Sequence, residues 1–165
     1  MVDWVENGIE PGALIGSRNA NVDANYPAAR TRPSCPYPEV ARYSGTGSID
    51  DAANFSCVPP VAVSIEPRVL DVSLSSSGEF TAFITVPKGY DVRDWNIHNV
   101  TCEGASAVAG VAYEDLYIAI FEIQDLQNVS PGKAVNMTCK LAFQHDGKEA
   151  LTQGSDTVRV IRRDR

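Results

Sequence analysis

The sequence predicts a mainly β protein, in which an immunoglobulin-like β-sandwich follows a mostly irregular N-terminal segment with a short helix. Two observations predict the sandwich: short β-branched and aromatic runs recur after Pro60, and turn signals separate them. A third observation concerns residues 1–58, which are rich in Asn, Asp, Gly, Pro and Ser and show little periodicity. We therefore predict an N-terminal part over residues 1–58 and a sandwich over residues 59–165.

The N-terminal segment carries few regular elements. Residues 1–8 have the pattern of the last turns of an amphipathic helix that ends at a glycine, and residues 13–18 predict a short strand. Residues 19–32 are polar and typical of a loop, and the prolines around Cys35 favour extended backbone. Such a segment cannot bury a core of its own, so we expect it to lie on another surface or to be flexible.

The second part alternates between strand patterns and turn signals. The turns are predicted at residues 87–89 and 130–133 and at Asp146-Gly147, a dipeptide that is a strong hairpin signal between two strands. The predicted strands cover residues 61–65, 78–86, 95–102, 116–121, 134–143 and 157–161.

Composition and charge exclude several classes of function. The formal net charge of −7 argues against nucleic-acid binding, which requires a basic surface. No apolar run approaches the roughly 20 residues of a membrane span. The sequence shows no cofactor-binding motif, so we expect no cofactor.

The chain has four cysteines: Cys35, Cys57, Cys102 and Cys139. None belongs to a Cys-x-x-Cys pair, which argues against zinc or thioredoxin-like chemistry. Two cysteines in each half of the chain suit one disulfide per half in an oxidising compartment, so we expect a secreted, cell-surface or periplasmic protein. The alternative is four buried free thiols.

The sequence offers no self-contained catalytic site. It lacks a Gly-x-Ser-x-Gly motif, and its only histidines are His98 and His145. His145 precedes the Asp146-Gly147 turn and is expected at the surface, whereas His98 lies on a predicted strand. Since nothing places a nucleophile beside either imidazole, we assign no catalytic residue.

Two further groups of residues are weak binding candidates. Asp50 and Asp51 are adjacent carboxylates that suit calcium, although adjacent aspartates more often cap a following turn, here residues 52–54. We otherwise expect no metal site. The aromatic side chains Trp95, Tyr113 and Tyr117 are candidates for stacking on a ligand, and the alternative is that they belong to the core.

Four runs in the first part, at residues 3–8, 31–38, 41–45 and 49–57, resemble the C-terminal end of the tannase/feruloyl esterase family. The resemblance implies an α/β-hydrolase that cleaves aromatic esters with a Ser, Asp and His triad. In that family the His lies shortly upstream of the segment that resembles residues 4–8, so we expect the triad to fall before Met1, and no catalytic residue is carried over. The resemblance also implies a Cys35–Cys57 disulfide.

Residues from about 59 to 162 resemble immunoglobulin-like modules that are appended to secreted or surface proteins of bacteria and archaea. Residues 65–67, 83–92 and 154–161 carry this resemblance. It implies a spacer, binding or adhesion module without catalytic activity. A Cys102–Cys139 bridge departs from the usual pattern of these modules but is compatible with the predicted strands.

We expect a non-catalytic C-terminal fragment of a secreted tannase/feruloyl-esterase-like carboxylic ester hydrolase, followed by an accessory sandwich. Its expected partner is an upstream hydrolase domain. The alternative is a stand-alone extracellular interaction or assembly module, either polysaccharide-binding or self-associating. Self-association through the N-terminal segment or the sheet edges is compatible with both hypotheses.

Overall fold

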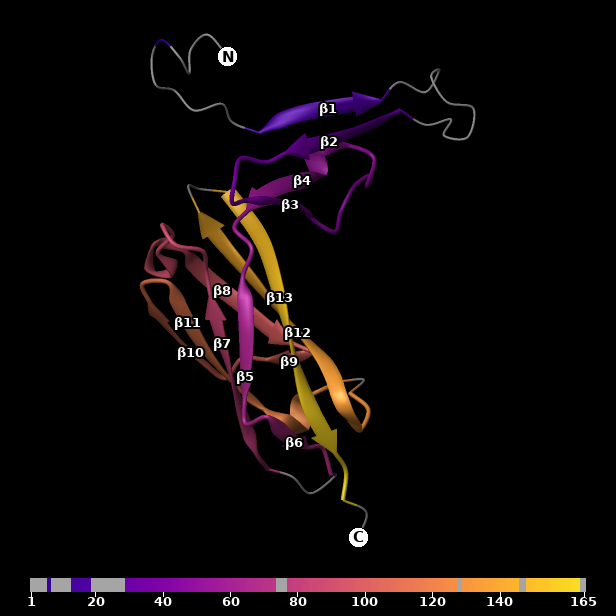
Figure 1. Ribbon diagram of the computed structural model, residues 1–165, viewed down its shortest axis with the longest axis vertical. Helices are drawn as coiled ribbons and strands as arrows, with labels where there is room; N and C mark the ends of the chain where they lie inside the picture. The colour runs from indigo at the N-terminus through magenta and orange to yellow at the C-terminus, as the bar shows by residue number, and fades with distance from the viewer. Residues whose placement is uncertain are drawn as a thin grey trace. The chain divides into compact units, whose positions relative to one another are not determined.

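The computed structural model of the chain describes residues 6, 13–18, 29–73, 77–127, 129–145 and 148–163, without the side chains of residues 145 and 148 (Figure 1). The chain divides into two compact units, Met1–Pro59 and Pro60–Arg165. Each unit consists mainly of β-strands, and the predicted mainly β fold class is confirmed.

The first unit contains two small sheets of two antiparallel strands each. The predicted strand at residues 13–18 is present as β1, whereas the other three strands were not predicted because they are short and one contains a proline. The predicted helix at residues 1–8 lies outside the described residues except for Glu6, which is helical. The pairs are β1 (Leu14–Arg18) with β2 (Arg30–Ser34) and β3 (Val40–Tyr43) with β4 (Phe55–Val58), and a 3₁₀ turn, η1 (Ala52–Asn54), precedes β4.

The described part of the first unit, residues 6, 13–18 and 29–59, has very little apolar interior. In its described part only Ala52, Val58 and Pro59 are buried. By contrast, four large apolar side chains are exposed by half or more of their surface: Leu14, Ile15, Tyr37 and Ile49. Hydrogen bonds, ion pairs and the Cys35–Cys57 disulfide therefore hold this unit together more than a hydrophobic core does.

The second unit is a sandwich of two sheets (Figure 1). The strand order is β10-β11-β7-β5 in the four-stranded sheet and β6-β13-β12-β8-β9 in the five-stranded sheet. All neighbours are antiparallel except β13 and β6, which are parallel. The strands are β5 (Ala62–Glu66), β6 (Val69–Asp71), β7 (Glu79–Thr85), β8 (Asn96–Cys102), β9 (Ala105–Ser106), β10 (Ala109–Tyr113), β11 (Leu116–Glu122), β12 (Gly132–His145) and β13 (Lys148–Ile161). Two 3₁₀ turns, η2 (Val92–Asp94) and η3 (Ile123–Asp125), connect strands.

The core lies between the sheets and follows the period-two alternation of the strands. Phe80, Ala82 and Ile84 of β7 are buried at alternate positions. The Phe80 ring stacks on Phe121 of β11, with 4.9 Å between the ring centroids. On β12 the buried side chains are likewise alternate, and these are Met137, Cys139, Leu141 and Phe143.

One side of the sandwich is closed by a close approach of β13 to β5. A Cβ on Gly154 would lie 2.6 Å from the carbonyl oxygen of Val61, so only glycine lets the two backbones come this near. Two residues further along, the carboxylate of Asp156 accepts a hydrogen bond from the N–H of Ile65 at 2.8 Å. The Asp156 carboxylate thereby satisfies a backbone donor on the edge strand of the opposite sheet.

The strands predicted in the second part are all present, and the hairpin predicted at Asp146-Gly147 joins the two longest. These two residues lie outside the described residues, but His145 pairs with Lys148 across them. The strand β13 begins at Lys148, well before the predicted start at residue 157. The strand β10 was not predicted because its sequence, Ala-Gly-Val-Ala-Tyr, lacks the usual density of β-branched residues.

Candidate functional site

His98, one of the two histidines, is a surface residue of β8. The Nδ1 atom of His98 lies 3.2 Å from the carbonyl oxygen of Asn96, and its Nε2 atom lies 3.5 Å from the Glu149 carboxylate. In the described part of the chain no serine hydroxyl lies within hydrogen-bond distance of this ring, and all four cysteines are in disulfides. The side chain of His145 lies outside the described residues.

The three aromatic candidates do not form one platform. Trp95 is 5% exposed and stacks on Phe143, with 4.2 Å between centroids, so it is a core residue and not a surface for ligand stacking. Tyr113 is 57% exposed and pairs with Leu116 on β11. Tyr117 follows Leu116 on β11 and therefore points to the opposite face of the same sheet. Burial raises the pKa of its phenol.

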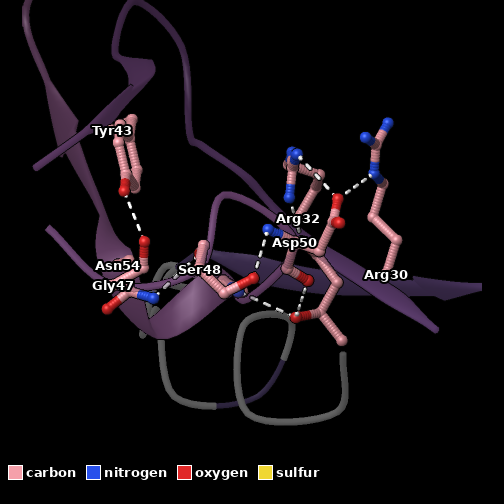
Figure 2. A network of polar contacts seen from close by, with 9 residues as sticks. Arg30, Arg32, Tyr43, Gly47, Ser48, Asp50 and Asn54 are labelled. Carbon is pink, nitrogen blue, oxygen red and sulfur yellow. Dashed lines mark hydrogen bonds and ion pairs between the residues drawn. The ribbon is translucent and has the colours of Figure 1, made fainter. Parts of the chain in front are cut away.

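Asp50 is the centre of an ion-pair network in the first unit (Figure 2). Its Oδ1 atom accepts a hydrogen bond from Nε of Arg30 at 2.7 Å and lies 3.6 Å from Nη2 of Arg32. The hydrogen bond from Arg30 holds the pKa of the Asp50 carboxyl below its usual range. Arg32 in turn lies over the ring of Phe55, with 4.6 Å from its guanidinium carbon to the ring centroid.

Asp51 acts as the cap of η1, because its Oδ1 atom accepts a hydrogen bond from the N–H of Ala53 at 2.9 Å. Both candidate calcium ligands are therefore engaged with donors of the protein itself. Across the described residues, no three His, Cys, Asp or Glu side chains are grouped so that they could hold a metal ion. The geometry gives the calcium alternative no support.

The loop between β3 and β4 is closed by its own hydrogen bonds (Figure 2). The hydroxyl of Tyr43 donates to the carbonyl of Gly47 at 2.5 Å, and the amide of Asn54 donates to the carbonyl of Ser48 at 2.9 Å. Gly47 has a φ of +78°, and a Cβ there would lie 2.5 Å from the Asn54 side chain. The loop thus has a defined shape that depends on a glycine at this position.

Both cysteine pairs are bonded. Cys35, the residue directly after β2, is bonded to Cys57 of β4, with 5.5 Å between the Cα atoms. Cys102 and Cys139 are directly opposite each other on β8 and β12, and they are bonded to each other. Two disulfides in one chain fit an oxidising compartment.

The outward face of the four-stranded sheet is largely apolar across β7, β11 and β10, and this was not predicted from the sequence. Residues directly opposite on neighbouring strands point to the same face. One row across β7, β11 and β10 is Phe83, Ile118 and Val111, and the next is Thr85, Leu116 and Tyr113. Val111 and Tyr113 are 49% and 57% exposed, and Phe83, Leu116 and Ile118 are half-buried. Strand register, which single-sequence patterns do not give, was needed to see this.

No helix among the described residues is long and apolar enough to span a membrane.

Residues 1–58 match the family model described as tannase and feruloyl esterase. An uncharacterized esterase of Xanthomonas campestris pv. campestris is 47% identical over 58 residues, which are 35% of this chain and 10% of that protein. The mono(2-hydroxyethyl) terephthalate hydrolase of Piscinibacter sakaiensis is 47% identical over 60 residues, again 10% of its length.

A probable feruloyl esterase B-2 of Neosartorya fischeri is 36% identical over 58 residues, which are 35% of this chain and 11% of that protein. Among solved structures, the crystal structure of BcpA, the major pilin subunit of Bacillus cereus, aligns with a TM-score of 0.33 and 13% identity, over 96% of this chain and 66% of that one. The chain spans about a tenth of the length of the esterases that it matches. The similarity to tannases and feruloyl esterases is therefore a property of the N-terminal third of this chain.

Proposed function

We propose that this chain is the non-catalytic C-terminal portion of a tannase/feruloyl-esterase-like carboxylic ester hydrolase, with an immunoglobulin-like accessory sandwich. Residues 1–58 would complete the body of the hydrolase, which polypeptide outside this chain supplies. The observation that carries the proposal is the small number of buried residues in the described part of the first unit. Its described part buries three residues, although its sequence matches a family of hydrolases.

The exposed apolar side chains of the first unit supply the physical reason. Leu14 and Ile15 of β1, with Tyr37 and Ile49, are exposed by 55% to 99%. Fully burying one side chain of this size is worth about 1.5–3 kcal/mol. Contact with a hydrolase body would recover this free energy, whereas the isolated unit leaves these side chains in water.

The remaining features of the first unit suit a tail that lies on a larger body. The Cys35–Cys57 disulfide and the ion pairs of Asp50 fix its loops without a core. The two disulfides of the chain support a secreted, cell-surface or periplasmic location. In this arrangement the hydrolase triad belongs to the body, and the sandwich takes no part in the chemistry.

The first test is an assay of the chain by itself on p-nitrophenyl butyrate and on galloyl and feruloyl esters. We expect no hydrolysis above the buffer rate. Turnover that a single substitution of a serine, or of His98, abolishes would overturn the proposal, because it would place a nucleophile or base in this chain.

The second test is a chimera. The matching 60-residue segment of the Piscinibacter sakaiensis hydrolase is replaced by the corresponding residues of this chain. We expect a soluble chimera that retains hydrolase activity, and loss of solubility or activity when Leu14→Glu and Ile15→Glu are introduced. The exposed turn variant Thr46→Glu is the matched control. A chimera that tolerates the β1 substitutions as well as the control contradicts a docking role for β1.

The apolar outward face of the four-stranded sheet favours a second candidate, a stand-alone module that self-associates. The edge strand beside this face, β10, has no charged residue and no proline to discourage pairing with another sheet. A second copy that packs on this face would cover Val111, Tyr113 and Ile118. Light scattering after size-exclusion chromatography decides this candidate: it requires a dimer that Ile118→Glu dissociates and Thr157→Glu, on the other sheet, does not. A monomer at all concentrations excludes it.

A further inference from the structure

A polar groove lies on the outward face of the five-stranded sheet, opposite to the apolar face described above. Its volume of about 550 Å³ is within the range of small-ligand sites, roughly 300–1,000 Å³. None of the residues that line it was predicted from the sequence to bind a ligand. These residues are Thr101, Glu103, Gly104, Gln127, Thr138, Lys140 and Gln153.

The floor of the groove is a row of polar side chains across three strands. Thr101 of β8 is directly opposite Lys140 of β12, and Lys140 is directly opposite Gln153 of β13. Neighbouring strands lie about 4.8 Å apart, so the row spans about 10 Å, the breadth of a sugar ring with its substituents. Lys140 is the central residue of the row, and no residue in the described part of the chain forms an ion pair with its ammonium group.

The Cys102–Cys139 disulfide lies on the inner face of the sheet, beneath the floor of the groove. Cys102 follows Thr101 and Cys139 precedes Lys140, and both cysteines are fully buried on the inner face of the same sheet. Because adjacent residues of a strand point to opposite faces, the disulfide lies directly under the row. It fixes the spacing of β8 and β12 where their outward side chains line the groove.

The wall of the groove is a tight turn that holds Gln127. Glu103 and Gly104 connect β8 to β9 with φ values of +46° and +86°, the conformation of a two-residue hairpin turn. A Cβ on Gly104 would lie 2.8 Å from side-chain carbons of Gln127, so the glycine lets that side chain lie against the turn. The N–H of Gln127 donates to the carbonyl of Glu103 at 2.8 Å, which fixes its backbone as well.

The chemistry of the lining selects a class of ligand. The groove presents the hydroxyls of Thr101 and Thr138, the amide of Gln127 and one ammonium group, and the Thr138 hydroxyl also lies 3.1 Å from the Ser155 hydroxyl. The carboxylate of Glu103 is engaged with the N–H of Thr138 at 2.7 Å. The lining has no aromatic or large aliphatic side chain, so it suits neither a lipid nor an aromatic ester.

We propose that this groove binds a saccharide that carries a carboxylate. Lys140 pairs with the carboxylate, and the threonine hydroxyls and the Gln127 amide bond the hydroxyls of the sugar ring. The protein has a net charge of −7, so attraction of an anion requires a local cation of this kind. This inference concerns the sandwich and does not depend on the hydrolase proposed for the first unit.

The test is a calorimetric titration of the whole chain with trigalacturonate and, separately, with the neutral trisaccharide of galactose. We expect trigalacturonate to bind with a Kd that Lys140→Met weakens about tenfold or more, the loss for one charge-assisted hydrogen bond. The neutral sugar should bind the wild type about as weakly as trigalacturonate binds this variant. Lys140→Arg should retain binding because the guanidinium also pairs with carboxylates.

The matched control is Lys133→Met, which removes the same charge from an exposed position of β12 outside the groove lining. A second variant, Gln127→Ala, tests the wall and should weaken binding of trigalacturonate at unchanged thermal stability. No heat of binding at millimolar sugar, equal affinity for the acidic and neutral sugars, or equal losses for the Lys140 and Lys133 variants would each overturn the proposal.

Discussion

The carboxylate of Glu103 accepts a hydrogen bond from the backbone N–H of Thr138 at 2.7 Å, while the N–H of Glu103 donates to the carbonyl of Thr138 at 3.2 Å. Beyond Cys102 the strand β8 turns away from β12 and no longer offers it a backbone acceptor. The Glu103 side chain takes the place of that acceptor. Its positive φ of 46°, which is unfavourable for a residue with a Cβ, is the local cost of this arrangement.

Removal of this acceptor should destabilise the sandwich. We expect Glu103→Ala to lower the free energy of unfolding by about 1–3 kcal/mol, because it leaves a part-buried N–H unsatisfied. Glu103→Gln keeps a side-chain oxygen and should lose clearly less. Urea denaturation followed by tryptophan fluorescence measures both. Equal stability of the alanine variant and the wild type would show that water replaces the carboxylate without loss.

Gly154 should be intolerant of any side chain. A Cβ there meets the carbonyl oxygen of Val61 at 2.6 Å and a methyl carbon of Val63 at 2.7 Å, and the backbone atom cannot move aside without shifting β5. We expect Gly154→Ala to cost roughly 1–3 kcal/mol of unfolding free energy. Thr157→Ala, at an exposed position of the same strand, should stay within about 0.5 kcal/mol of the wild type. Thermal unfolding of the two variants side by side decides the point.

Asp156 should contribute to the loss of stability in acid. The hydrogen bond from Arg68 is the main cause that holds the pKa of Asp156 below that of an ordinary aspartate, about 3.9. A group whose pKa is lowered by folding stabilises the folded state above its unfolded pKa, and this contribution is lost as the pH falls through the folded pKa. We expect Asp156→Asn to be less stable than the wild type at pH 7, and the difference to shrink as the pH falls below about 4.

Urea denaturation at a series of pH values measures this difference. Asp71 and Asp91 also have lowered pKa values, mainly through hydrogen bonds from Ser73 and Arg93 respectively, so the variant should retain part of the acid dependence. A difference between Asp156→Asn and the wild type that stays constant from neutral to acidic pH would contradict a role for the ionised carboxylate.

The two disulfides should stabilise different parts of the chain. The Cys102–Cys139 bridge closes a loop with a sequence separation of 37, which corresponds to about 4 kcal/mol in the chain-entropy model. We expect the double variant Cys102→Ala, Cys139→Ala to lower the stability of the sandwich by an amount of this order. The variant Cys35→Ala, Cys57→Ala should leave the unfolding of the sandwich unchanged, and it serves as the control. Equal effects of the two double variants would show that the units unfold together.

The strand partners of Lys140 are an example of what the sequence alone can predict. The Asp146-Gly147 hairpin pairs His145 with Lys148, and counting back along both strands places Lys140 opposite Gln153. The pairing of Thr101 with Lys140 follows in the same way once Cys102 and Cys139 are taken as a cross-strand disulfide. The hairpin turn and the Cys102–Cys139 disulfide are therefore enough to predict which residues form the floor of the groove.

The wall of the groove and the apolar outward face could not be predicted from the sequence in this way, because they depend on contacts between segments that are far apart in the chain. Nothing local in the sequence places Gln127 against Gly104. The row of Phe83, Ile118 and Val111 exists only because β7, β11 and β10 are neighbours in the sheet. The same limit explains Trp95: an aromatic residue on an alternating strand is compatible with either face, and only its stacking on Phe143 decides between them.

The ion pairs of Asp50 should protect the first unit from proteolysis. Asp50 holds the Arg30 side chain at 2.7 Å, and the Thr31 N–H donates to the Asp50 carbonyl at 2.8 Å, so the peptide bond after Arg30 is held in β2 by contacts with one residue. Asp50→Asn removes the charge that attracts both arginines, and we expect trypsin to cleave after Arg30 faster in this variant. Asp51→Asn is the matched control, because asparagine caps a helical turn as well as aspartate does. Mass spectrometry of timed digests identifies the cut, and equal rates for the two variants would show that the backbone bonds of β2 suffice without the ion pairs.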